Sequence, residues 1–126
     1  MGFICPSCHT SGSLQITKRL ELPPDSRSDE ITLQIVRCRR CEFAGIAIYE
    51  ESRRGVMGDE AVDHRGYYVS TSDLQRLKKL LRECPEPGNS RCTCATHRQM
   101  GVKDKSGRWA GLAGIELDHR FQMRYG

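Results

Sequence analysis

The chain has little of what membrane proteins and large hydrophobic cores require. Hydrophobic residues make up 37% of its 126 positions, and aromatic residues only 6%. No apolar run approaches the roughly 18–20 residues of a membrane span. Residues 1–5 show neither the basic nor the apolar region of a signal peptide. We therefore expect a cytoplasmic protein without a membrane segment, whose small core needs support beyond apolar packing.

Cysteine, by contrast, is abundant, with seven residues. Four of them form two CxxC turns, Cys5-Pro6-Ser7-Cys8 and Cys38-Arg39-Arg40-Cys41. Each turn can place two thiolates on one side, and two facing turns make the closed tetrahedral site that structural Zn²⁺ prefers. Iron in a rubredoxin-type centre is the alternative metal. Disulfides are disfavoured in a reducing compartment, and two CxxC copies disfavour a redox motif.

The other three cysteines lie close to one histidine, which predicts a second zinc site. Its expected ligands are Cys84, Cys92, Cys94 and His97. Three thiolates and one imidazole are a recognised structural zinc set, although this spacing is irregular. The alternative is a group of unligated cysteines after a helix, with Cys84 buried as a small apolar residue. Two complete four-ligand sites would use every cysteine, so no cysteine is left to act as a nucleophile. The sequence also shows no recognisable Ser-His-Asp or Cys-His arrangement, and we therefore expect no catalytic residue.

Residues 10–49 predict an antiparallel meander. Leu14, Ile16, Leu20 and Leu22 alternate with polar residues, which is typical of one half-buried strand. A turn is expected at residues 23–26, followed by strands through Ile31–Ile35 and residues 44–49. We therefore expect a three-stranded antiparallel ribbon that carries both CxxC turns.

The remainder predicts a second unit packed on the ribbon. Residues 50–69 are expected to form a polar connector with a short strand at 66–69. An amphipathic helix is expected over 72–83, with Ser72 as its N-cap. The apolar residues after position 107 predict C-terminal strands: Trp109, Leu112, Ile115, Leu117, Phe121 and Met123. The fold class is thus a small metal-stabilised α+β protein, with a ribbon domain at 1–54 and a second unit at 55–126.

Residues 5–49 resemble the zinc-ribbon superfamily, and the resemblance assigns the metal-ligand role to the cysteines of the two CxxC turns. The segment Arg27-Ser28-Asp29-Glu30 is also similar to the Arg-Ser-Ala-Asp-Glu hairpin of the transcript-cleavage elongation factors. In that family the acidic pair reaches into RNA polymerase and helps to hold a catalytic Mg²⁺, which would be the role of Asp29 and Glu30. This chain lacks the alanine, and no glycine follows Cys41.

Two function classes remain in view, and neither involves a small-molecule substrate. The first is a non-enzymatic adaptor or accessory subunit that binds a protein partner. The second is a nucleic-acid-binding protein, in which Arg37, Arg39 and Arg40 beside the second CxxC turn contact phosphates. The two zinc sites would add two and one negative charges, which lowers the formal net charge from +4 to +1. The overall charge therefore argues only weakly for a polyanionic partner.

Overall fold

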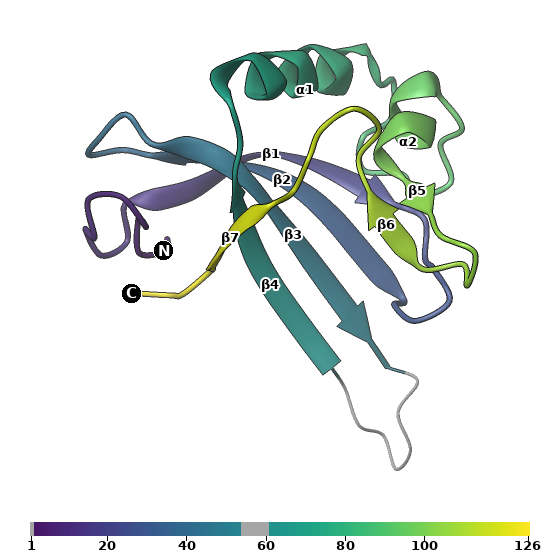
Figure 1. Ribbon diagram of the computed structural model, residues 1–126, viewed down its shortest axis with the longest axis horizontal. Helices are drawn as coiled ribbons and strands as arrows, with labels where there is room; N and C mark the ends of the chain where they lie inside the picture. The colour runs from purple at the N-terminus through teal and green to yellow at the C-terminus, as the bar shows by residue number, and fades with distance from the viewer. Residues whose placement is uncertain (1, 54–60) are drawn as a thin grey trace.

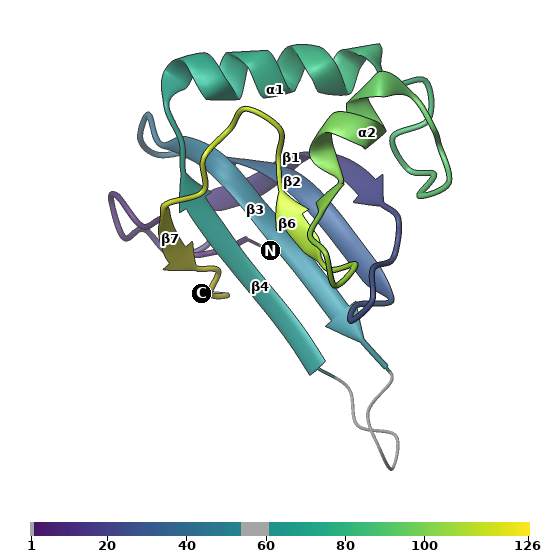
Figure 2. The same cartoon turned by 45° about the vertical axis from the view of Figure 1, so that its right-hand side comes forward.

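The computed structural model describes residues 2–53 and 61–126, which form one five-stranded antiparallel sheet with helices on one side. The strands are β1 (Leu14–Leu22), β2 (Glu30–Cys38), β3 (Ala44–Ser52), β4 (Ala61–Tyr68) and β7 (His119–Gln122), side by side in that order. Helix α1 (Thr71–Glu83) lies across one face of the sheet, as Figures 1 and 2 show. Next to it lie a short helix, α2 (Ala95–Met100), and a hairpin of β5 (Val102–Lys103) and β6 (Trp109–Gly111). In the part of the chain described, no helix has the length and apolar character needed to cross a membrane.

The expected α+β class is confirmed, but the strand and helix counts are wrong. The sheet has five strands instead of three, because β4 and β7 extend the meander. Residues 61–68 were expected to be mostly connector, since their side chains are polar. In the structure Arg65 lies diagonally across from Glu50 and binds both Glu50 and Asp63, two carboxylates that face each other across β3 and β4, so this arginine stabilises the extension. Helix α2 was missed, and the expected boundary at 54/55 lies outside the described residues.

Strand β1 serves both faces of the sheet, which corrects the single alternation expected from Leu14 to Leu22. A β-bulge skips Thr17, so that Ile16 pairs with Val36 while Lys18 pairs with Ile35. Since cross-strand partners share a face, the bulge moves every later side chain of β1 to the opposite side. Leu14 and Ile16 therefore pack on the face away from α1, and Leu20 and Leu22 pack under α1.

Two hydrophobic clusters result, one on each face. The larger lies between the sheet and the helices and includes the buried α1 residues Leu74, Leu77 and Leu81. The C-terminal segment closes it with Leu112 and Ile115, while β7 pairs with β4 in the sheet. The smaller lies on the opposite face, beside the CxxC turns: Phe3, Leu14, Val36, Ala47 and Met123 with the two cysteines Cys5 and Cys38. The C-terminal segment thus contributes to both clusters, with Leu112 and Ile115 in the larger and Met123 in the smaller.

The N-cap of helix α1 lies two residues before the expected one. The hydroxyl oxygen of Ser70 accepts a hydrogen bond from the backbone N–H of Asp73 at 3.1 Å, so Ser70 is the N-cap and the predicted Ser72 is wrong. Both serines precede an apolar periodic segment, but only Ser70 has an acidic residue at the third position of the helix, which favours the cap electrostatically.

The turn between β1 and β2 is fastened by a buried carboxylate. Asp25 is 7% exposed and accepts hydrogen bonds from the backbone N–H groups of Arg27, Ser28 and Trp109. These donors outweigh burial, which alone would raise the pKa of Asp25, and hold that pKa below its usual value. The acidic pair lies just after this turn, where the Asp29 carboxylate accepts a hydrogen bond from the N–H of Arg53.

Candidate metal centres

The first cysteine cluster joins the start of β1 to the end of β2. Backbone bonds between Phe3 and Leu14 bring the N-terminal turn against the strand. The second turn directly follows β2, and its Arg39 N–H donates to the carbonyl of Ser13. Cys5 and Cys38 are buried, Cys41 is half-buried and Cys8 is exposed. Two turns that are distant in sequence therefore face each other at one end of the sheet.

The sulfur spacing of this cluster fits a tetrahedral ion. Cys5 Sγ lies 3.7 Å from Cys41 Sγ, and Cys8 Sγ lies 3.7 Å from Cys38 Sγ. A tetrahedron whose corners lie about 2.3 Å from its centre, the Zn–S distance, has edges of about 3.8 Å. A disulfide would require about 2.05 Å between the sulfurs. All four ligand atoms lie within 4.8 Å of one another, so the cluster could hold a metal ion.

Hydrogen bonds prepare these sulfurs for negative charge. Burial alone would raise the pKa of Cys38, but the Ser13 hydroxyl and the N–H groups of Arg40 and Cys41 lower it to about 6. The N–H of Phe43 favours the Cys41 thiolate, yet burial and the neighbouring thiols raise the pKa of Cys41 to about 12. Hydrogen bonding with Thr10 also lowers the pKa of Cys8. The thiolates of Cys38 and Cys8 are therefore favoured, whereas Cys41 stays protonated until a cation offsets the neighbouring sulfurs.

The second cluster lies near the other end of β1 and is assembled from helix ends. Cys84 caps the C-terminus of α1, Cys94 caps the N-terminus of α2, and His97 lies within α2. Cys92 is positioned by a turn, with its N–H donating to the carbonyl of Asn89. The hydroxyl of Thr96 donates to the carbonyl of Leu80 at 2.7 Å, which fastens the two helices together.

The histidine of this cluster is oriented by the sheet. His97 Nε2 lies 2.9 Å from the carbonyl oxygen of Glu21, so Nε2 carries the proton and donates it. This leaves the lone pair of Nδ1 for a metal, and Nδ1 lies 3.3 Å from Sγ of both Cys84 and Cys94. A tetrahedral zinc site would place N and S about 3.5 Å apart. Glu21 N–H also donates to the carbonyl of Pro87, so two bonds join the cluster to β1.

The thiols of the second cluster also differ in acidity. Burial alone would raise the pKa of Cys94, but hydrogen bonds, above all from the backbone N–H of His97, lower that pKa to about 6. Burial raises the pKa of Cys84 to about 11, and the neighbouring cysteines add to the effect. The four ligand atoms lie within 4.8 Å of one another, so this cluster could also hold a metal ion. The grouping expected from the irregular spacing is thus present.

The three other histidines lie apart from these clusters. His64 hydrogen bonds to Gln34 at 2.7 Å, and its strand neighbour Asp63 points to the opposite face. His119 and Asp118 join neither cluster, and His9, next to Cys8, is exposed. Within residues 2–53 and 61–126, only the two predicted clusters bring together three or more metal-binding side chains.

The three arginines beside the second CxxC turn are exposed. Two of them, Arg39 and Arg40, line a surface hollow together with Thr10, Ser11 and Ser13. Sequence reasoning named the arginines but missed the hydroxyl-bearing residues, because these follow the other CxxC turn. The backbone bond from Arg39 to Ser13 and the cysteine cluster bring the two turns together.

Comparisons with protein-family models, curated proteins and solved structures find no match to this chain. The case for function therefore rests on the geometry of the two clusters and the surface around them.

Proposed function

We propose that this chain is a non-enzymatic binding module, held in shape by two structural zinc ions, that serves as an adaptor or accessory subunit in a cytoplasmic complex. The observation that carries the proposal is the ligand count. Each cluster supplies four protein ligands at tetrahedral spacing, which is the structural arrangement, whereas catalytic zinc keeps a position for water or substrate.

Zinc is the metal that this donor chemistry favours. Seven of the eight ligands are thiolates and one is an imidazole, a set that selects zinc or iron over magnesium or calcium. The imidazole of the second cluster favours zinc there, and iron remains the alternative at the first.

Metal analysis of the purified full chain tests this proposal. We expect two zinc ions per chain, and loss of cooperative thermal unfolding, followed by circular dichroism, when a strong chelator removes them. Recovery on adding zinc completes the test. A folded, cooperative protein without metal would contradict the proposal, and a visible thiolate-to-iron absorption band would reassign the first site.

A group of aromatic side chains supports a protein partner. The rings of Phe43, Tyr68 and Phe121 contact one another edge to face, with centroids 5.1–5.7 Å apart, beside the first cluster. Tyr68 is 43% exposed, and aromatic residues are enriched where proteins bind proteins. Substituting Tyr68 with alanine should weaken binding to such a partner while leaving the zinc content at two.

Nucleic acid is the second candidate partner. It is favoured by the hollow that Arg39 and Arg40 share with the exposed Ser11, because guanidinium and hydroxyl groups are common phosphate ligands. Titration of the zinc-loaded protein with oligonucleotides at low and moderate salt separates the two candidates. Absence of binding at low salt would leave the protein partner alone.

A further inference from the structure

Three hollows follow one another around the N-terminal segment, and each shares a residue with the next. The first, of about 570 Å³, contains Arg39 and Arg40. The second, of about 450 Å³, contains Arg39, Gln15 and Tyr125. The third, of about 480 Å³, lies on the sheet face away from α1 and contains Tyr125 and Arg19. Arg39 lines the first two hollows and Tyr125 the last two, so the three are neighbours on the surface, and we call this row of hollows the track.

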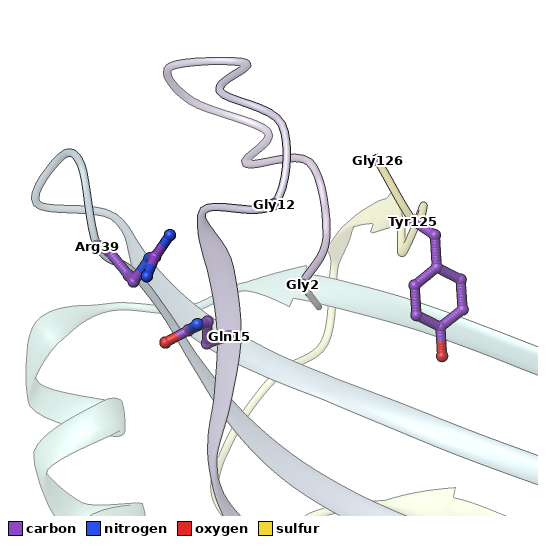
Figure 3. A pocket seen from close by; sticks show the side chains of 6 residues that line it. All are labelled: Gly2, Gly12, Gln15, Arg39, Tyr125 and Gly126. Carbon is purple, nitrogen blue, oxygen red and sulfur yellow. The ribbon is translucent and has the colours of Figure 1, made fainter.

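The middle of the track is a low backbone crossing. Figure 3 shows Arg39 and Gln15 on one side of the segment that carries Gly2, and Tyr125 on the other side. Gly2 has no room for a side chain, since an added Cβ would lie 2.6 Å from the carbonyl oxygen of Gly12. The glycine therefore lets two backbone segments lie in contact here, and the second hollow spans this crossing, with Gln15 and Tyr125 both in its lining.

The arginine end of the track has the chemistry of a phosphate site. Among the described residues, no carboxylate lies within ion-pair distance of Arg39 or Arg40. The two arginines share the first hollow with Thr10, Ser11 and Ser13. The Ser13 hydroxyl is buried and donates to the carbonyl of Thr10, and the Thr10 hydroxyl bonds to Cys8, whereas Ser11 is exposed. Guanidinium groups bind phosphate oxygens with paired hydrogen bonds, and the Ser11 hydroxyl can add a further donor.

The tyrosine of the track is a supported stacking platform. Tyr125 is 72% exposed, yet its ring stacks on Phe3 with centroids 4.5 Å apart and an angle of 25° between planes. Phe3 in turn contacts His64, and His64 contacts Tyr49, which extends the row of rings into the third hollow. Backing on one face holds the Tyr125 ring, and exposure leaves it accessible to a planar group, as base stacking requires.

The far end of the track limits where phosphates can lie. Glu21 and Glu30 line the third hollow, and burial together with neighbouring carboxylates raises the pKa of Glu30. Gln34 and His64 offer hydrogen-bonding groups there instead. A polar, ring-lined hollow with carboxylates at its end suits an uncharged base better than a phosphate.

We propose that single-stranded nucleic acid binds along this track, with phosphates at Arg39 and Arg40 and a base stacked on Tyr125. The proposal rests on the chain being a binding module and specifies its second candidate partner. A duplex is disfavoured because its bases are stacked on each other and unavailable to the tyrosine.

Fluorescence anisotropy with labelled oligouridine, oligothymidine and a duplex of equal length tests the track. We expect a single strand to bind more tightly than the duplex, with the ribose and deoxyribose probes showing which sugar is preferred. The double variant Arg39→Gln/Arg40→Gln should lose about tenfold or more in affinity, and its salt dependence should flatten by about 0.7 per lost phosphate contact. Arg82→Gln, an exposed arginine on α1, is the charge control and should bind like the native chain.

The tyrosine has its own matched pair. Tyr125→Leu should weaken single-strand binding roughly 5- to 100-fold, whereas Tyr125→Phe, which keeps the ring, should bind like the native chain. Equal affinities for Tyr125→Leu and Tyr125→Phe, or for the arginine double variant and Arg82→Gln, would overturn the proposal. So would a duplex that binds as tightly as the single strands, or no binding of either strand at low salt. Zinc content and thermal unfolding of each variant show separately whether the metal-stabilised module itself is intact.

Discussion

The two cysteine clusters hold opposite ends of β1, but they are built from different parts. The first uses two tight turns whose own backbone N–H groups approach the sulfurs, as with Arg40 N–H and Cys38 Sγ at 3.3 Å. The second uses the ends of two helices and depends on the sheet, since Glu21 orients His97. One cluster therefore organises the strands around it, whereas the other docks a helical segment onto strands that already exist.

The largest expected effect is at the first cluster. Cys38→Ser removes a buried ligand, and the free energy of structural zinc binding, about 10–16 kcal/mol, is comparable to the whole stability of a small domain. We expect the variant to lose cooperative unfolding, measured by circular dichroism and by the dispersion of amide proton signals. A sharp thermal transition near the native one would show that the strands do not need this cluster.

Cys94→Ser should have a smaller and more local effect. We expect the zinc content to fall from two ions per chain to one. Amide hydrogen exchange should accelerate over residues 84–111, and it should accelerate less in β1, β2 and β3. The reason is that this cluster attaches α2 and the β5–β6 hairpin, while the first cluster remains. Loss of protection throughout the sheet would mean that the two clusters act as one unit.

At the same end of the sheet, Asp25 links the β1–β2 turn to the β5–β6 hairpin without a metal ion, because its carboxylate accepts hydrogen bonds from both. Asp25→Asn should cost about 1–3 kcal/mol in the free energy of unfolding, because a buried charge-assisted network loses acceptors. Since the folded-state pKa of Asp25 is lowered, its stabilisation is present above about pH 4, its unfolded pKa, and is lost as the pH falls below that value.

The measurement is the difference in unfolding free energy between the native chain and Asp25→Asn at several pH values. Acid also protonates the thiolates, but that effect is common to both proteins and cancels in the difference. A difference that stays constant from neutral pH to pH 3 would contradict the assigned role.

The smallest expected effect comes from His97→Cys, which keeps four ligands. Zinc content should remain two, while stability falls by about 1 kcal/mol because the hydrogen bond to Glu21 is lost. Metal analysis and denaturant unfolding of the same sample check this. A loss of zinc equal to that of Cys94→Ser would show that the imidazole is needed as a ligand and not only as a link to β1.

The sequence predicted those features that depend on local spacing. The CxxC turns, the first three strands and α1 each have a short-range signal, and the four ligands of the second cluster were found by counting donors. What it could not predict depends on contacts between distant segments. The pairing of β4 with β7, the bond from His97 to Glu21 and the meeting of Ser13 with Arg39 have no local signal. The choice of Ser70 over Ser72 as the cap was decided by one acidic residue.

The bulge at Thr17 has a consequence for how this strand can change in length. The bulge lets one strand contribute to the hydrophobic clusters on both faces. The side chains in each half of β1 therefore face their own cluster only while that extra residue is present. Removing one residue near position 17 would turn either Leu14 or Leu20 toward the wrong side, even with every side chain retained. Substitutions along β1 can therefore accumulate singly, whereas a one-residue deletion requires two clusters to be rebuilt at the same time.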